Sequence, residues 1–387
     1  MAKNSKKTKK IKKKTFRKIV SLIVAILIAI ASLILYLNPD LYNKLMDLIN
    51  GEQPPLITEI VCEDYYADEE LPFIVHFIDI GQGDAILIQF PDNKVMLIDA
   101  GDNDNVNNTK LLTYISELGI ETIDYVVATH ADADHIGGMY DVFYNFEVKK
   151  VFRPYVYYSG DAYSFDKSYN KGSSAYKQSS KTYGNFLNAI RNEKYVENGV
   201  TKDCEWEFFT YTSDFGSNIY YNGKKTTYTV DFLTPTMDLT DMNYEDANDY
   251  SPLIKVSYCD FDIMLTGDAE TEAEKDCIEA YSISDEYKNY LDCDLLKVSH
   301  HGSGTSTTAG FLELVKPEMA VISCGTDNKY FHPHQQVLNR LIEYNCNLLY
   351  RTDTNGDIVL TIETKGEYEI DVLKNDFANN FDSPSKK

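Results

Sequence analysis

Apolar and polar positions change period several times along the chain, and each period predicts a different element. Short apolar runs bounded by turn residues predict strands, whereas apolar positions three and four residues apart predict helices. The strands are predicted at 73–80, 85–90, 94–98, 125–128, 228–233, 253–258, 261–266, 295–299, 319–323, 348–351, 357–364 and 368–373. The helices are predicted at 110–118, from about 138 onward, and at 186–190, 270–281, 311–315 and 333–344.

The order of these segments indicates the fold class. Strands come in groups with helices between them, which favours an α/β (α+β) layered sandwich with its helices outside. The folded domain is expected to span residues 73–373, followed by a polar tail at 374–387. Residues 154–185 hold seven tyrosines among many serines and glycines, which predicts a long loop or lid rather than core.

The N-terminus differs in character from the rest of the chain. Residues 1–18 contain ten Lys or Arg and no acid, and residues 19–37 contain no charge. Nineteen residues as a helix are about enough to cross a bilayer core of roughly 30 Å. Because no convincing cleavage site follows, this stretch predicts an uncleaved signal anchor rather than a cleaved signal peptide. The basic flank should remain cytoplasmic. The expectation is a single-pass cell-membrane protein with a stalk at 38–72 and an extracytoplasmic domain.

The charge balance narrows the choice of partners. The chain has 37 basic and 60 acidic residues, and ten of the basic ones lie in the first 18 positions, leaving 27 basic residues against 60 acidic ones. Nucleic-acid binders usually carry a basic footprint, because phosphate contacts dominate their affinity. The composition therefore argues against tight non-specific DNA binding and is typical of a solvated acidic surface on a secreted protein.

The seven cysteines are dispersed and form no C-x-x-C pair, which disfavours a zinc ribbon. One or two disulfides would be compatible with an extracytoplasmic domain. Cys259 and Cys324 lie in apolar runs and are predicted to be buried small hydrophobic residues.

Histidines gather at predicted strand ends. Six of the seven lie in three short clusters: His130 with His135, His300 with His301, and His332 with His334. The first cluster, with Asp132 and Asp134, directly follows an apolar strand. Carboxylates and imidazoles packed so closely are costly to bury unless cations lie among them. The pattern therefore predicts a metal centre.

Further candidates follow other strands. Asp268, in Leu265-Thr266-Gly267-Asp268, is either a ligand or a helix N-cap. Ser303, after the histidine pair, is disfavoured as a nucleophile because no Ser-His-Asp order with a nucleophile elbow appears. His332 precedes Pro333 at a predicted helix start. There it would contact a substrate anion, act as an acid, or simply cap the helix.

These motifs resemble the metallo-β-lactamase superfamily, and more narrowly the hydrolase domain of ComEC-type competence proteins and their stand-alone relatives. The resemblance covers roughly residues 73–373 in the family's order, and it implies an αββα sandwich with a two-metal site between the sheets. The matching segments are Phe77–Ala85, Leu97–Gly101, Thr129–Gly138, Leu265–Glu270 and Lys297–Ser303.

The resemblance also implies roles for individual residues. Asp268 would bridge two divalent ions, and His300 is the alternative to His301 as the last histidine ligand. The superfamily's middle histidine ligand has no histidine counterpart between His135 and His300. Asn248 stands where related chains carry Asn, either as a weak ligand or hydrogen-bonded to a bound water. Two acids, Asp84 and Asp99, would lie behind the ligands. The implied ligands are His130, Asp132, Asp134, His135, Asp268 and His301. In most of the superfamily the position of Asp132 is a histidine.

Such a site suits zinc or manganese and hydrolysis of a phosphodiester or phosphoester, DNA or RNA among the candidates. Asp134 would orient the attacking water, and His332 would contact the leaving group or phosphate. One alternative is another envelope ester, such as a lactone or a phosphocholine ester bound by Tyr155, Tyr157 and Tyr158. Another is a non-catalytic, metal-stabilised surface protein. No protein partner is predicted.

Overall fold

The computed structural model describes residues 72–159, 176–221, 224–364, 367–374 and 380–384, all within one compact unit. The predicted cytoplasmic tail, the signal anchor and nearly all of the stalk lie outside these residues. Within the described ranges, no helix is both long and apolar enough to span a bilayer.

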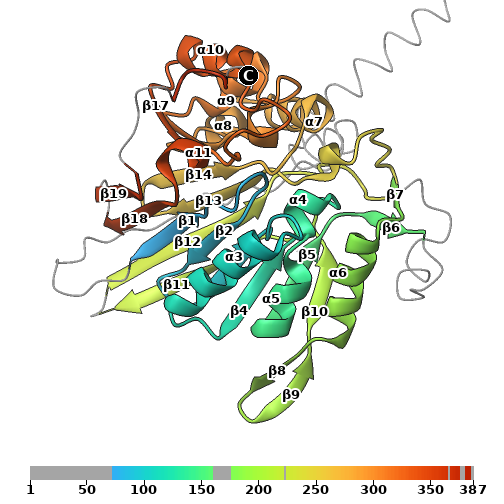
Figure 1. Cartoon of the computed structure of the whole chain (residues 1–387). Coiled ribbons are helices and arrows are strands. Elements are labelled where there is room, and N and C mark those ends of the chain that lie inside the picture. The colour runs from blue at the N-terminus through green and yellow to red at the C-terminus, as the bar shows by residue number, and fades with distance from the viewer. Residues whose placement is uncertain (1–71, 160–175, 222–223, 365–366, 375–379, 385–387) are drawn as a thin grey trace, which may run out of the picture. The chain divides into compact units, whose positions relative to one another are not determined.

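Two large sheets form the centre of the described chain (Figure 1). The first has the strand order β10 (Glu205–Phe208), β5 (Glu147–Arg153), β4 (Thr122–Val127), β3 (Val95–Ile98), β2 (Ile86–Gln89), β1 (Phe73–Phe77), β18 (Ile358–Thr364) and β19 (Glu367–Val372). The second has the order β11 (Phe215–Tyr221), β12 (Lys224–Phe232), β13 (Ile254–Tyr258), β14 (Phe261–Leu265), β15 (Leu295–Lys297), β16 (Met319–Ile322) and β17 (Leu348–Arg351). Two small ribbons pair β6 (Val156–Tyr158) with β7 (Tyr176–Gln178), and β8 (Lys194–Glu197) with β9 (Val200–Asp203).

The space between the two sheets is filled by every second residue of their strands. In β1, Phe73, Val75 and Phe77 are fully buried and pack in one cluster with Val230 and Val256 of the second sheet. Because side chains alternate across a strand, the remaining positions face the outer layers. This alternation joins the sheets face to face.

Helices cover the outer face of each sheet (Figure 1). The first sheet is covered by α3 (Asn105–Glu117), α5 (Met139–Asn145) and α6 (Lys181–Asn192), and the second by α7 (Thr271–Tyr281), α9 (Ala309–Val315) and α10 (Gln335–Glu343). Shorter helices are α4 (Ala133–Ile136), α8 (Asp285–Tyr290) and α11 (Thr352–Asn355), with 3-10 turns η2 (Asn248–Tyr250) and η3 (Ser299–Gly302). The four layers are those of the expected αββα sandwich.

The prediction of a loop or lid at 154–185 is wrong for the part that the structure describes. This part contains β6, β7 and the start of α6, and Tyr155, Tyr158 and Tyr183 lie in the outer core of the first sheet. The Tyr183 hydroxyl donates a hydrogen bond to the Val156 carbonyl oxygen at 2.8 Å. A tyrosine whose hydroxyl is bonded packs as a large apolar side chain, which the polar composition of the segment concealed. Residues 160–175 lie outside the described ranges.

Two further differences have local causes. Strand β5 was not predicted because its charged residues interrupt the apolar pattern, yet it pairs with β4 on one side and β10 on the other. Its Lys149 forms an ion pair with Asp124 of β4 at 2.8 Å. The prediction for cysteine holds for Cys324, a free and fully buried thiol. Cys259 is buried too, but it is disulfide-bonded rather than a simple apolar residue.

Candidate metal centre

The candidate side chains come from both sheets and meet at one edge of the sandwich. His130 follows β4, and α4 then supplies Asp134 and His135. From the second sheet, Asp268 follows β14, and the η3 turn after β15 supplies His300 and His301. The strands β3, β4, β14 and β15 each run parallel to a neighbour, so their carboxyl ends share one edge and bring these loops together.

The loops pack too closely for ordinary side chains at two points. Gly83 lies against the histidine loop, where an added Cβ would come within 2.1 Å of the Asp134 carbonyl oxygen. Gly138 lies against β3, where a Cβ would come within 2.3 Å of the Ala100 carbonyl oxygen. Glycine is required at such contacts because any side chain would push the loops, and their ligands, apart.

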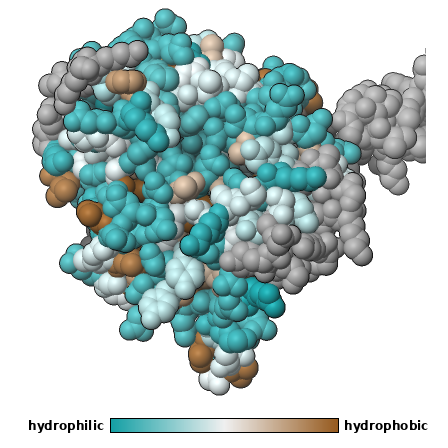
Figure 2. Space-filling view, turned by 45° about the vertical axis from the view of Figure 1, so that its right-hand side comes forward, coloured by the Kyte–Doolittle hydropathy of each residue, from teal (hydrophilic) through white to brown (hydrophobic). Residues whose placement is uncertain are grey.

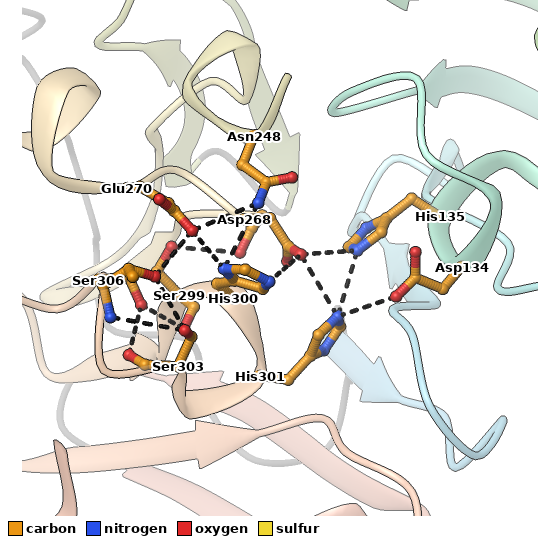
Figure 3. A network of polar contacts seen from close by, with 12 residues as sticks. Asp134, His135, Asn248, Asp268, Glu270, Ser299, His300, His301, Ser303 and Ser306 are labelled. Carbon is orange, nitrogen blue, oxygen red and sulfur yellow. Dashed lines mark hydrogen bonds and ion pairs between the residues drawn. The ribbon is translucent and has the colours of Figure 1, made fainter. Parts of the chain in front are cut away.

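Asp268 is the centre of the cluster (Figure 3). Its Oδ2 atom lies 3.2 Å from Nε2 of His135, 3.4 Å from Nε2 of His301 and 3.7 Å from Nε2 of His300. The Nε2 atoms of His135 and His301 are 3.3 Å apart. Asp134 completes this side, with Oδ2 at 3.6 Å from Nε2 of His301.

The chemistry of this donor set fits divalent cations. Among the residues that the structure describes, three groups of potential ligand atoms lie within 4.8 Å of one another, and two of them contain two imidazoles each: His130, His135 and Asp268, and Asp134, His135 and His301. The third group is Asp84, Asp99 and His135. In the described part of the chain, His130 Nε2 and Asp268 Oδ1 are buried without a hydrogen-bond partner. Burial and the neighbouring His135 imidazole lower the pKa of His130 to about 3, which keeps the metal-binding neutral form.

A further layer of side chains orients the imidazoles. The Nδ1–H of His135 donates to Asp99 Oδ2 at 2.7 Å, and that of His301 donates to the Ser323 carbonyl oxygen at 2.9 Å. Asp99 also accepts from the Thr129 backbone N–H at 2.9 Å. Because Nδ1 carries the proton, Nε2 carries the lone pair, and it is Nε2 that faces the cluster. Metal-binding histidines commonly have such a hydrogen-bond acceptor at the other ring nitrogen.

Asp84, the other acid expected behind the ligands, has a partner that sequence reasoning missed. Its Oδ2 atom lies 2.7 Å from Nζ of Lys297, and both side chains are almost completely buried. Its other oxygen is 3.5 Å from Nδ1 of His301. The signal available in the sequence was a lysine inside the apolar strand before the histidine pair, where an unpaired charge would be costly.

Three of the named residues lie away from these two groups. Asp132 is half-buried at the start of α4 and belongs to neither group, and burial together with Asp134 raises the pKa of its carboxyl. The Ser303 hydroxyl lies 2.8 Å from that of Thr305. Asn248 donates to Glu270 Oε1 at 3.4 Å, and Glu270 in turn holds His300, a partnership that sequence reasoning did not identify.

His332 lies beside the cluster. Its ring centroid is 5.4 Å from that of His300 and 6.3 Å from that of His301. The expectation that it caps a helix is wrong, because α10 begins at Gln335 with His334 as its N-cap. Burial and the imidazoles of His301 and His300 lower the pKa of His332 to about 3, so its ring is neutral at physiological pH.

A four-layer sandwich with a buried imidazole–carboxylate cluster at the edge shared by its two sheets defines a protein of the metal-dependent hydrolase class. The model of the metallo-beta-lactamase superfamily matches residues 78–326, and the chain belongs to that superfamily. The fold and the donor set together imply divalent metal ions at this edge.

The curated relatives that the chain matches include a competence protein and a recombination protein. The chain is 27% identical to ComE operon protein 3 of Bacillus subtilis over 304 residues, which cover 73% of this chain and 32% of that protein. It is 26% identical to competence protein ComA of Neisseria gonorrhoeae over 278 residues, 72% of this chain and 30% of that protein. Recombination protein 2 of Haemophilus influenzae is 26% identical over 273 residues, 70% of this chain and 26% of that protein. The chain thus matches a third or less of each relative.

Removing divalent ions is expected to destabilise the domain. Ions that bind only the folded state add about 2.7 kcal/mol when free ion is at roughly 100 times its Kd. Differential scanning calorimetry of metal-loaded protein with and without a chelator measures the change. A chelator already saturated with zinc is the control. Equal unfolding temperatures in all three samples would show that the cluster binds no ion.

Proposed function

We propose that this chain is a membrane-anchored, extracytoplasmic hydrolase of phosphodiester or phosphoester bonds that uses two divalent ions, zinc or manganese. The observation that carries the proposal is the pair of ligand groups that contain two imidazoles each. They share His135, and Asp268 belongs to the first of them. When bound, two such ions supply an activated water and positive charge that stabilises the transition state of phosphoryl transfer.

The side chains around the cluster have distinct tasks in this proposal. Asp134 is the most exposed of the carboxylates at the centre, at 30%, against 3% for Asp268, so it faces the open side and orients the attacking water. Burial alone would raise the pKa of Asp134, but the His301 hydrogen bond and the His135 charge outweigh it and hold the pKa below the usual range. The carboxylate is therefore ionised and can accept a hydrogen bond from water. His332 contacts the phosphate or leaving group.

The surface bears on the choice of phosphoester. The face in Figure 2 is mostly hydrophilic, with apolar side chains in small separate patches. Acidic residues outnumber basic ones in the whole chain, so non-specific attraction to DNA is weak. The names of the competence relatives favour a nucleic-acid substrate. We therefore propose DNA or RNA as one candidate among phosphoesters, delivered to the site rather than captured by the surface.

The two alternatives find less support. A phosphocholine site would depend on Tyr155, Tyr157 and Tyr158. Tyr155 and Tyr158 are 5% and 6% exposed, and Tyr157 is half-buried against the same core cluster. They do not form an open aromatic cage. A purely structural metal site would be closed by protein atoms, whereas Asp134 and His300 remain partly exposed.

Location outside the cytoplasm has one supporting observation within the described residues. Cys259 is disulfide-bonded, and structural disulfides persist in oxidising compartments. The uncharged segment at 19–37 and the basic flank at 1–18 support a single span with the N-terminus in the cytoplasm.

The proposal predicts hydrolysis of a simple phosphodiester. Full-length protein purified in detergent and loaded with manganese or zinc should cleave bis(p-nitrophenyl) phosphate, followed by release of p-nitrophenol. Asp134→Asn should lower the rate on the order of a hundredfold, because the amide cannot accept a proton from water. Asp102→Asn, an exposed acid on a neighbouring loop, is the matched control. Metal-loaded protein that cleaves no member of a phosphodiester panel would contradict the proposal.

A further inference from the structure

We propose that His300 is a metal ligand, which binds one of the two ions together with Asp268. No other histidine lies between His135 and His300 in the sequence. His301 would bind the other ion with Asp134 and His135. This inference rests on the two-ion site of the proposed function and identifies its ligands more closely.

The first argument is that His300 shares the bonding pattern of its three neighbours. In each ring the Nδ1 atom is hydrogen-bonded on the side away from the cluster. The partners are Thr129 and Ser251 for His130, Asp99 for His135, and the Ser323 carbonyl oxygen for His301. In His300, Nδ1–H donates to Glu270 Oε1 at 2.7 Å. A carboxylate behind Nδ1 is the usual partner of a metal-binding imidazole, because it fixes the tautomer and raises the basicity of Nε2.

The second argument is where the free nitrogen of His300 points. Its Nε2 atom lies 3.7 Å from Asp268 Oδ2, so it faces the same carboxylate as His135 and His301. In Figure 3, Asp268 stands between His300 on one side and His135, His301 and Asp134 on the other. A carboxylate with imidazoles on both sides is placed to bridge two ions. His300 is then the imidazole available on the side away from Asp134.

The third argument comes from the backbone. Consecutive residues in extended or helical chain point their side chains in different directions, and both histidines would not normally face one carboxylate. Here His300 and His301 have φ values of 48° and 53°, in the left-handed region that non-glycine residues rarely adopt. Such strain persists where the surrounding structure enforces it, most often at functional sites. In this turn it directs both rings at Asp268.

Asn248 fits the same assignment. Its Nδ2 atom donates to Glu270 Oε1 at 3.4 Å, so this amide contacts the carboxylate that holds His300. Thr305 also donates to Glu270 Oε1, at 2.7 Å. Asn248 and Thr305 therefore both stabilise the carboxylate that holds Nδ1 of His300.

The test is the number of ions bound per chain. Full-length protein, dialysed against buffered free manganese or zinc, is analysed for metal by mass spectrometry. Wild-type protein should hold two ions. His300→Ala should lose one of them, with its dissociation constant raised about a hundredfold or more. Glu270→Gln should weaken the same ion roughly tenfold, since partners behind a ligand matter less than the ligand itself.

A matched control separates this outcome from a general loss of the site. His334→Ala removes an imidazole whose ring lies 4.8 Å from that of His332 but that has no contact with Asp268 among the described residues, and it should keep both ions. Cobalt substitution adds a second measurement, because the visible absorption of the ion at His300 should change in Glu270→Gln even if His300→Ala does not fold. Two ions of wild-type affinity in His300→Ala, or an unchanged cobalt spectrum in Glu270→Gln, would overturn the inference. Metal counts do not depend on turnover, so two ions in an inactive wild-type protein would refute the proposed function alone.

Discussion

Asp268→Asn is expected to lower kcat/KM for a phosphodiester by about a thousandfold, or ~4 kcal/mol of transition-state stabilisation. Asp268 is the carboxylate that faces the Nε2 atoms of His135, His300 and His301, and it is 3% exposed. An amide of the same shape removes the negative charge that two cations would share, so the ions bind more weakly and less regularly. The measurement is steady-state hydrolysis of bis(p-nitrophenyl) phosphate at saturating manganese, with metal content determined on the same samples.

Asp285→Asn provides the comparison for this variant. Asp285 lies in the first turn of α8 and is exposed, so the same chemical change should leave the rate within about twofold. Retention of more than a tenth of the activity in Asp268→Asn would contradict its placement between two ions. Loss of activity in both variants would instead indicate a general effect of removing acidic charge.

Lys297→Met is expected to destabilise the folded domain by about 3–5 kcal/mol, because breaking a buried ion pair leaves an uncompensated charge. Lys297 and Asp84 are 0% and 1% exposed, and Nζ lies 2.7 Å from Oδ2. Urea unfolding followed by tryptophan fluorescence or circular dichroism measures the loss. Asp84 also lies 3.5 Å from Nδ1 of His301, so a weakened metal affinity should accompany it.

The chain offers an exposed ion pair of similar length as the control. Lys94 Nζ lies 2.8 Å from Asp92 Oδ2, with the side chains 37% and 19% exposed. Lys94→Met should cost at most about 1 kcal/mol, because solvent screens an exposed pair. The double variant Lys297→Met with Asp84→Leu should recover part of the lost stability. Equal effects of Lys297→Met and Lys94→Met would show that burial does not govern the first pair.

The local sequence pattern was enough to predict those strands and helices whose own apolar residues determine their structure. Strands such as β1 and β13 alternate apolar residues that fill the space between the sheets, and this period is visible without any partner. Strand β5 is different, because Lys149 and Lys150 make it look exposed until Asp124 and Glu207 of the adjacent strands are known. The tyrosines of β6 and α6 were misjudged for a similar reason. The hydroxyl of Tyr183, for example, is bonded to Val156 and Arg153, which lie in other segments.

The site divides in the same way. His130, Asp134, His135, Asp268 and His301 could be named from motifs, since a metal centre at strand ends needs those side chains in those places, and the structure brings them together. Asp132, equally prominent in the motif, is the N-cap of α4 and lies outside both ligand groups. Lys297 and Glu270 gave only weak signals. Lys297 matters because it pairs with Asp84, which is distant in the sequence. Glu270 matters because it pairs with His300, which lies on another loop.

By itself the sequence determined the layered fold through the period of its segments, and the residue types of the metal centre through motifs within short segments. The superfamily followed from the resemblance of those motifs to a known family. Only the tertiary structure decided which nitrogen of each imidazole faces Asp268, which acids stand behind them and which histidine stands opposite Asp134. Those choices depend on distances between loops of different sheets. They arise when parallel strands place their carboxyl ends at one edge, and no local pattern contains that geometry.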